Sequence, residues 1–142
     1  MITLVDYLPD HMLQIGVQEK QSEMLGEITK QYAHALATAG IAYTVMLDNR
    51  VLACGGKAKQ WEGRWILWAV LSREASRHML RLTKITKRTL ELHNHVGRLE
   101  AIVRSDFEQA HRWVKMLGLK WHHHEERFLP GGLDADIYVR FS

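Results

Sequence analysis

The first third of the chain has one strand pattern followed by two helical patterns. Residues 2–8, ITLVDYL, alternate apolar and polar positions, as a half-buried strand does, and Pro9 and Asp10 then start a helix near His11. From Ser22 to Ala39 apolar residues return at helical spacing, and Gly40 supplies a typical C-terminal stop. The pattern therefore predicts a strand and two helices, the second over residues 22–39.

The middle of the chain is typical of a hairpin, a buried strand and a long helix. In residues 41–56, IAYTVMLDNRVLACGG, two β-rich runs surround Asp48 and Asn49, which tolerate the backbone of a tight turn. The run RWILWAVL, residues 64–71, is far shorter than the roughly 20 residues of a membrane span, and it predicts a strand covered on both faces. Ser72 can cap the helix that follows. The buried positions of that helix are Ala75, Met79, Leu82, Ile85, Thr89 and Leu92.

The last third predicts a strand, a helix and a hairpin. RLEAIVRS, residues 98–105, is a strand, and Ser105 with Glu108 has the spacing of a capping box for a helix that ends at Gly118. The turn LPGGLD then joins two more strands. Because no repeat or linker divides residues 1–142, we expect one α/β domain with the order β-α-α-β-β-β-α-β-α-β-β.

Composition narrows the class of protein. The chain has 142 residues, a hydrophobic share of 46% and a charged share of 25%, which are ordinary values for a globular domain. Its one cysteine, Cys54, cannot form an internal disulfide, and we expect an inert, buried thiol. The opening residues lack the basic and apolar segments of a secretory signal. These features favour synthesis in the bacterial cytoplasm and no membrane insertion.

The positive charge is concentrated in one segment. Residues 72–93 contain six basic and two acidic residues and so carry +4, whereas the net charge of the whole chain is +3. This segment can contact phosphates or an acidic partner, or it can be a solvated helix face. It has no aromatic residues for base stacking and no helix-turn-helix pattern, so any DNA contact would be nonspecific. The candidate contact residues are Arg73, Arg77, Arg81, Lys84 and Arg88.

The histidines and tryptophans indicate function less clearly than the basic segment does. His122, His124 and Glu126 share one face of a strand but span roughly 13 Å, so they cannot converge on a metal without a bulge, and we predict no metal site. His93 and His95 lie near a helix end, where they complement the helix dipole. Packing accounts first for three tryptophans, Trp65, Trp68 and Trp113. Trp61 and Trp121, if exposed, would indicate a protein interface.

The order of elements and two segments, WILWAVLSREASR and FEQAHRWVKMLGL, resemble the GNAT acetyltransferase superfamily. The resemblance spans essentially the whole chain and implies a mixed, mostly antiparallel central sheet flanked by about four helices. It also implies a phosphate-binding loop after the fourth strand, with a Gln or Arg followed by two small residues, and a tyrosine near the end of the following motif that protonates the leaving thiolate.

The residues that carry this chemistry depart from the family pattern. Arg73 matches the loop, but Ser76 and His78 stand where the family has small residues, and their side chains occupy space that phosphate oxygens need. Val114 stands at the tyrosine position and cannot donate a proton, so the acid would have to be Tyr138 or a histidine. Glu62 is the nearest candidate base.

A narrower resemblance agrees with these departures. The segments VLACGG and MLGLKWHHHEERFLPGG, with the basic helix between them, look like the GNAT-like internal core proteins of short-tailed phages. That resemblance implies a non-catalytic component of the virion interior, with other virion or assembly proteins, or further copies of this chain, as partners and no cofactor. Such a chain could also contact DNA.

Two alternatives remain open at this stage. One is an acetyl-CoA-dependent N-acetyltransferase with a degenerate loop, and the other is a phage-made inhibitor of a host protein. In the acetyltransferase, the cofactor would be held by Val70, Leu71, Arg73, Ser76 and Arg77.

Overall fold

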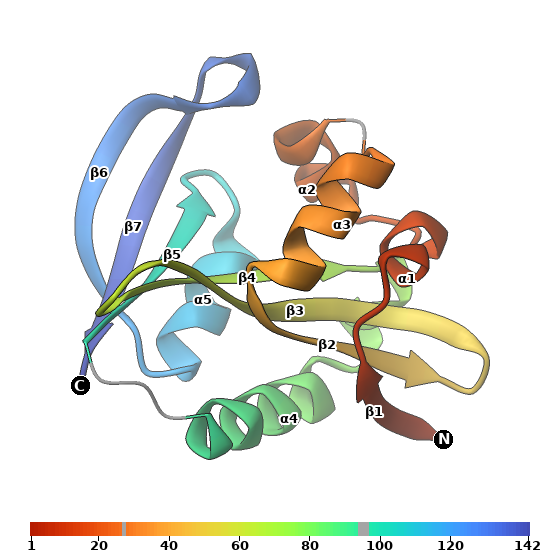
Figure 1. Cartoon of the computed structure of the whole chain (residues 1–142). Helices are drawn as coiled ribbons and strands as arrows, with labels where there is room; N and C mark the ends of the chain where they lie inside the picture. The colour runs from red at the N-terminus through yellow and green to blue at the C-terminus, as the bar shows by residue number, and fades with distance from the viewer. Residues whose placement is uncertain (27, 94–96) are drawn as a thin grey trace.

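A computed structural model describes residues 1–26, 28–93 and 97–142, and it shows one seven-stranded sheet with helices on both faces (Figure 1). The predicted α/β class is confirmed. The strands are β1 (Ile2–Asp6), β2 (Gly40–Leu47), β3 (Arg50–Trp61), β4 (Arg64–Leu71), β5 (Arg98–Arg104), β6 (Lys120–Leu129) and β7 (Leu133–Phe141).

Five α-helices lie among the described residues, against about four predicted. They are α1 (Pro9–Gln14), α2 (Glu19–Leu25), α3 (Lys30–Thr38), α4 (Met79–Leu92) and α5 (Glu108–Met116). Two 3-10 turns, η1 (Arg73–Arg77) and η2 (Pro130–Gly132), complete the fold. No helix in the described ranges has both the length and the apolar character that a membrane crossing requires.

The sheet has the order β1-β2-β3-β4-β5-β7-β6, and β4 and β5 are its parallel pair. The remaining neighbours run antiparallel. Pairing between β4 and β5 begins at Arg64 with Arg98 and ends at Leu67 with Ala101. The last four residues of β4 therefore have an edge that β5 does not cover, and this edge positions the candidate site.

The predicted helix over residues 22–39 is wrong, because it is two helices. Gly26 has φ 68° and ends α2, a backbone conformation that side-chain-bearing residues rarely adopt. Thr29 then caps α3, its Oγ1 accepting from the amide of Tyr32 at 3.1 Å. Ser22, which the sequence suggested as the start, lies inside α2.

Other predicted helix starts and faces also shift. Ser72 does act as a cap, but it caps η1 by accepting from the amide of Ala75, and α4 begins only at Met79. The predicted capping box of Ser105 and Glu108 is not formed, since α5 begins at Glu108 after an uncapped Phe107. Leu92, expected in the buried stripe of α4, is 76% exposed.

Apolar cores lie on both faces of the sheet. Helices α1 and α3 cover one face, where Met12, Ala33 and Val70 pack together, and α4 and α5 cover the other (Figure 1). Cys54 is buried in the first core, and burial raises the pKa of its thiol to about 11, as expected of an inert cysteine.

The tryptophans follow the expected division. Trp65, Trp68 and Trp113 are half-buried against the cores, whereas Trp61 and Trp121 are exposed.

The C-terminal end of α4 is held by the sheet. Nε2 of His93 lies 2.6 Å from the hydroxyl of Tyr43, and the ammonium of the buried Lys57 donates to the carbonyl of His93. A cation at this end complements the helix dipole. His95, for which a similar role was predicted, lies outside the described residues.

Candidate functional site

A crevice opens where β4 and β5 stop pairing. A cavity of about 300 Å³ lies there, mostly lined by apolar side chains. Trp68, Val70 and Ile102 are among its lining residues, as are Trp113 and Val114 from α5. In a sheet, unpaired main-chain groups at such an opening are available to bind an extended ligand.

The side chain of Gln21 in α2 occupies the open edge of β4. Its Nε2 donates to the carbonyl of Ala69 at 2.8 Å, and its Oε1 accepts from the amide of Leu71 at 2.7 Å. The main-chain amide of Ser72 points toward β3 and donates to the carbonyl of Leu52. Because main-chain groups alternate in direction along a strand, the amide and carbonyl of Leu71 face the crevice. The side-chain amide of Gln21 thus forms hydrogen bonds with β4 as the main chain of a neighbouring strand would.

The loop before α2 continues this pairing beyond the end of β4. The amide of Gln18 donates to the carbonyl of Leu71 at 3.1 Å, and the amide of Arg73 donates to the carbonyl of Gly16 at 2.9 Å. Val17 and Ser72 form an antiparallel bridge between the two segments. We call residues 16–25, which bond to β4 in this way, the α2 strap.

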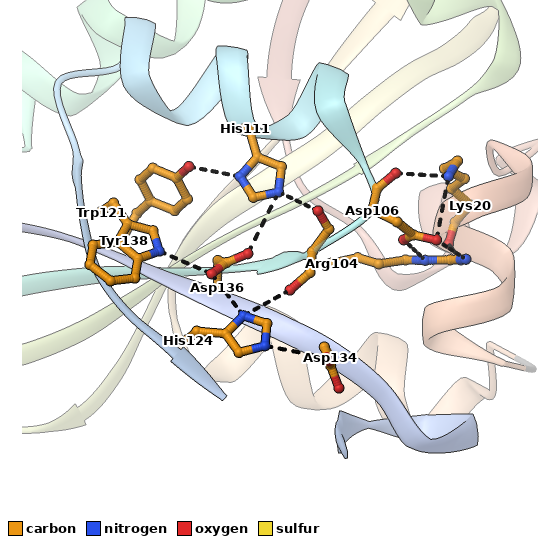
Figure 2. A network of polar contacts seen from close by, with 10 residues as sticks. Lys20, Arg104, Asp106, His111, Trp121, His124, Asp134, Asp136 and Tyr138 are labelled. Atoms are coloured by element: carbon orange, nitrogen blue, oxygen red, sulfur yellow. Dashed lines mark hydrogen bonds and ion pairs between the residues drawn. The ribbon is translucent and has the colours of Figure 1, made fainter. Parts of the chain in front are cut away.

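The α2 strap is also fixed to β5, on the other side of the crevice. Arg104 is buried at the end of β5, and its Nη1 donates to the carboxylate of Glu23 at 2.7 Å and to the carbonyl of Lys20 at 3.1 Å. Lys20 in turn donates to the carbonyl of Asp106 at 2.9 Å (Figure 2). The strap therefore bridges the two diverging strands.

The predicted cofactor residues lie together at the end of β4, but several of the main-chain amides there already have partners. Val70 and Leu71 bury their side chains in the two cores. The amide of Arg73 donates to the strap, and the hydroxyl of Ser76 donates to the carbonyl of Arg73 at 3.0 Å. The amides of Ala75 and His78 donate within η1. The amides of Arg73, Ala75 and His78 would therefore have to leave these partners before they could bind a diphosphate.

Of the candidate acids and bases, Tyr138 and Glu62 lie outside the crevice. Val114 does line the cavity, where the resemblance requires a tyrosine. Tyr138 is buried on β7 and its hydroxyl lies 2.7 Å from Nδ1 of His111, but neither is among the described residues that line the cavity. The side chain of Glu62 is 94% exposed in a turn, paired with Lys59. Two other groups that can donate a proton, Tyr43 and His93, do line the cavity, and they lie 2.6 Å from each other.

His111 and Tyr138 belong to a polar network that fastens α5 and β6 to β7 (Figure 2). Nε2 of His111 lies 2.9 Å from the carbonyl of Ser105 and 3.9 Å from the carboxylate of Asp136. Asp136 also accepts from Nε1 of Trp121 at 2.9 Å. Each polar group has a partner inside the network, which indicates a structural role.

The histidines of β6 do not form a metal centre. His124 lies between two carboxylates, 3.1 Å from Asp136 and 3.3 Å from Asp134, and these raise its pKa, with Asp136 the larger cause. The strand does have a bulge between Trp121 and His123. Even so, the described residues contain no group of three or more potential ligands placed to hold a metal ion.

The predicted phosphate-contact residues form a different surface. Arg73, Arg77, Arg81, Lys84 and Arg88 are exposed on η1 and α4. The sequence did not identify Gln21 or Arg104 as site residues. Neither residue belongs to a sequence motif, so no local signal distinguishes them.

Comparison with known proteins identifies solved structures that share this fold. No protein-family model and no curated protein sequence matches the chain. Among solved structures, the ribosomal-protein-S18-alanine N-acetyltransferase from Escherichia coli matches with a TM-score of 0.77 and 15% identity, over 98% of this chain and 92% of that one. Ard1 from Thermoplasma volcanium matches with a TM-score of 0.80 and 13% identity, over 98% and 96%.

A putative phosphinothricin N-acetyltransferase also matches, with a TM-score of 0.79 and 11% identity over 100% of this chain and 99% of that one. The chain thus has the acetyltransferase-type GNAT fold over its whole length. At these identities the likeness establishes the fold alone. Two of these three proteins are named as N-acetyltransferases, and none of the three supports the phage core-protein resemblance.

Proposed function

We propose that this chain uses an acetyltransferase-type scaffold for binding and does not transfer acetyl groups, serving as an assembly component such as an internal protein of a phage particle. The observation that carries the proposal is the α2 strap. The main-chain groups of Ala69, Leu71 and Arg73 that face the crevice are bonded to Gln21, Gln18 and Gly16. A ligand that pairs with this edge must first break those bonds.

The residue at position 114 supports the same proposal. Val114 lies in the cavity wall where the resemblance requires a proton-donating tyrosine, and His111 and Tyr138 contact each other outside the described lining of the cavity. The assignment to a phage particle rests on the sequence resemblance alone.

The second candidate is an acetyl-CoA-dependent N-acetyltransferase. Two observations favour it: the fold matches N-acetyltransferases end to end, and an apolar cavity lies between β4 and β5. In this candidate Val70, Leu71, Arg73, Ser76 and Arg77 would lie along the cofactor, and the α2 strap would have to leave β4 before the cofactor binds.

Thermal unfolding in the presence of acetyl-CoA separates the two candidates. A ligand at 100 times its Kd stabilises the folded state by about 2.7 kcal/mol, which raises the Tm of a domain of this size by several degrees. We expect millimolar acetyl-CoA to leave the Tm unchanged, both in the wild type and in Gln21→Ala, which frees the edge of β4. Gln31→Ala, an exposed glutamine on α3, is the matched control.

A rise in the Tm of the wild type would support the acetyltransferase. A rise in Gln21→Ala alone would also overturn our proposal, because it would reveal an intact cofactor site beneath the α2 strap. Unchanged Tm values in all three proteins would support the binding scaffold.

A further inference from the structure

The outer face of α4 carries charge that the rest of the protein does not neutralise. We call Arg77, Arg81, Lys84, Lys87 and Arg88 the α4 basic face. All five side chains are exposed, and none forms an ion pair or a side-chain hydrogen bond with any residue in the described ranges. Three arginines elsewhere form ion pairs: Arg50 with Glu74, Arg64 with Glu100, and Arg104 with Asp106.

The α4 basic face has a fixed geometry. Arg81, Lys84 and Arg88 follow one another at spacings of three and four residues, so they form one line along the helix. Along α4 itself, the line from Arg81 to Arg88 is roughly 10 Å long at about 1.5 Å per residue, and Arg77 lies just before it on η1. Helix α4 lies against one face of the sheet (Figure 1). Leu82, Thr83 and Leu90 are buried on that side of the helix, whereas the basic residues are exposed.

An apolar side chain lies within this face. Leu80 is 74% exposed in the first turn of α4, and it lies one helical turn from Lys84. Most of this leucine side chain is therefore open to solvent beside the cations. This arrangement indicates a surface that binds a partner with both negative charge and an apolar group.

We infer that the α4 basic face, with Leu80 near its N-terminal end, docks an acidic segment of a partner protein that presents an apolar side chain. Duplex DNA would neutralise the charges but would leave Leu80 uncovered. A membrane surface fits poorly, because Leu80 and Leu92 lie at opposite ends of α4 and no continuous apolar stripe remains exposed between them. This surface does not involve the crevice, so the inference is independent of whether the protein transfers acetyl groups.

The experiment measures binding of a fluorescent acidic peptide by anisotropy. The peptide is about 15 residues long, enough to span α4 as a helix, with leucines on one helical face, and a second peptide has the same composition with its leucines scattered. We expect the first peptide to bind at least tenfold more weakly to the triple variant Arg81→Glu, Lys84→Glu, Arg88→Glu. The matched control variant reverses the charge of three exposed lysines outside this face: Lys30→Glu, Lys115→Glu, Lys120→Glu.

Leu80→Ser tests the apolar contact separately. We expect it to weaken binding of the first peptide about fivefold, with little effect on the scattered peptide, because only the former covers Leu80. Duplex DNA and anionic lipid vesicles are measured in parallel.

Three results would overturn the inference: equal loss of binding in the control variant, no effect of Leu80→Ser, or tighter binding of DNA or vesicles than of the first peptide. Circular dichroism of each variant checks that it is folded.

Discussion

At the scale of single residues, Glu100 shows how a buried charge is kept in this fold. It lies on β5 with its side chain 7% exposed, and its Oε1 accepts from Nε of Arg64 at 2.5 Å and from Nε of Arg98 at 2.7 Å. The hydrogen bond from Arg64 is the main cause that lowers the pKa of Glu100 from its ordinary value of 4.5. A carboxylate with a lowered pKa stabilises the folded state above that ordinary value and loses the effect as the pH falls through its folded pKa.

We predict that Glu100→Gln lowers the free energy of unfolding by about 1–3 kcal/mol at neutral pH, because it leaves two arginines without their shared carboxylate. The same variant should lose less stability than the wild type on acidification below the ordinary pKa of glutamate. Urea unfolding at a series of pH values measures both effects.

The matched control is Glu74→Gln, which breaks the exposed ion pair with Arg50. This substitution should lower the free energy of unfolding by less than about 1 kcal/mol. Equal costs for the two variants would mean that burial does not distinguish the two ion pairs.

At the scale of elements, the break between α2 and α3 makes the α2 strap possible. Gly26 has φ 68°, and no other heavy atom would lie within 4 Å of an added Cβ. The position is therefore constrained by its backbone conformation and not by packing. Without this break, α2 and α3 would continue as the single helix that the periodicity predicts, and Gln21 would not be held at β4 by a separate element.

We predict that Gly26→Ala lowers the free energy of unfolding by about 1–3 kcal/mol, the cost of a side chain in a strained backbone conformation. Gly16→Ala is the matched control, since Gly16 also has nothing within 4 Å but does not have a positive φ. It should change stability by less than about 1 kcal/mol or stabilise the protein. Thermal and urea unfolding measure both variants, and equal effects would contradict the role of the positive φ.

At the scale of the whole molecule, the two cores share one sheet. Met12 is 1% exposed in the core beneath α1 and α3, and Leu119 is 2% exposed in the core beneath α5. Because strands β2, β3 and β4 contribute side chains to the cores on both faces, neither core can lose its packing while the sheet stays intact.

We therefore predict a single unfolding transition. Met12→Ala and Leu119→Ala should each cost about 2–5 kcal/mol, and each should shift the midpoints of far-UV circular dichroism and tryptophan fluorescence together. Leu13→Ala, a partly exposed position on α1, should have a much smaller effect. Separate midpoints for the two probes in either core variant would show that the faces unfold independently.

The sequence by itself determined the elements and much of their chemistry. Strand β4 was predicted at its observed bounds, since a short, wholly apolar run has few other conformations in a protein of this size. The turn at Asp48, where φ is 54°, was predicted for the same local reason. The valine at position 114 and the clustered cations of α4 are likewise properties of the sequence.

Tertiary structure alone decided which polar groups meet across the crevice. Gln21 and Leu71 are 50 residues apart, and Arg104 and Glu23 are 81 residues apart. The hydrophobic periodicity of the sequence indicates which side of a helix or strand faces the core. It does not indicate which distant side chain will bond to a free strand edge. That choice depends on the path of the whole chain, so the closed crevice could not be inferred from the sequence.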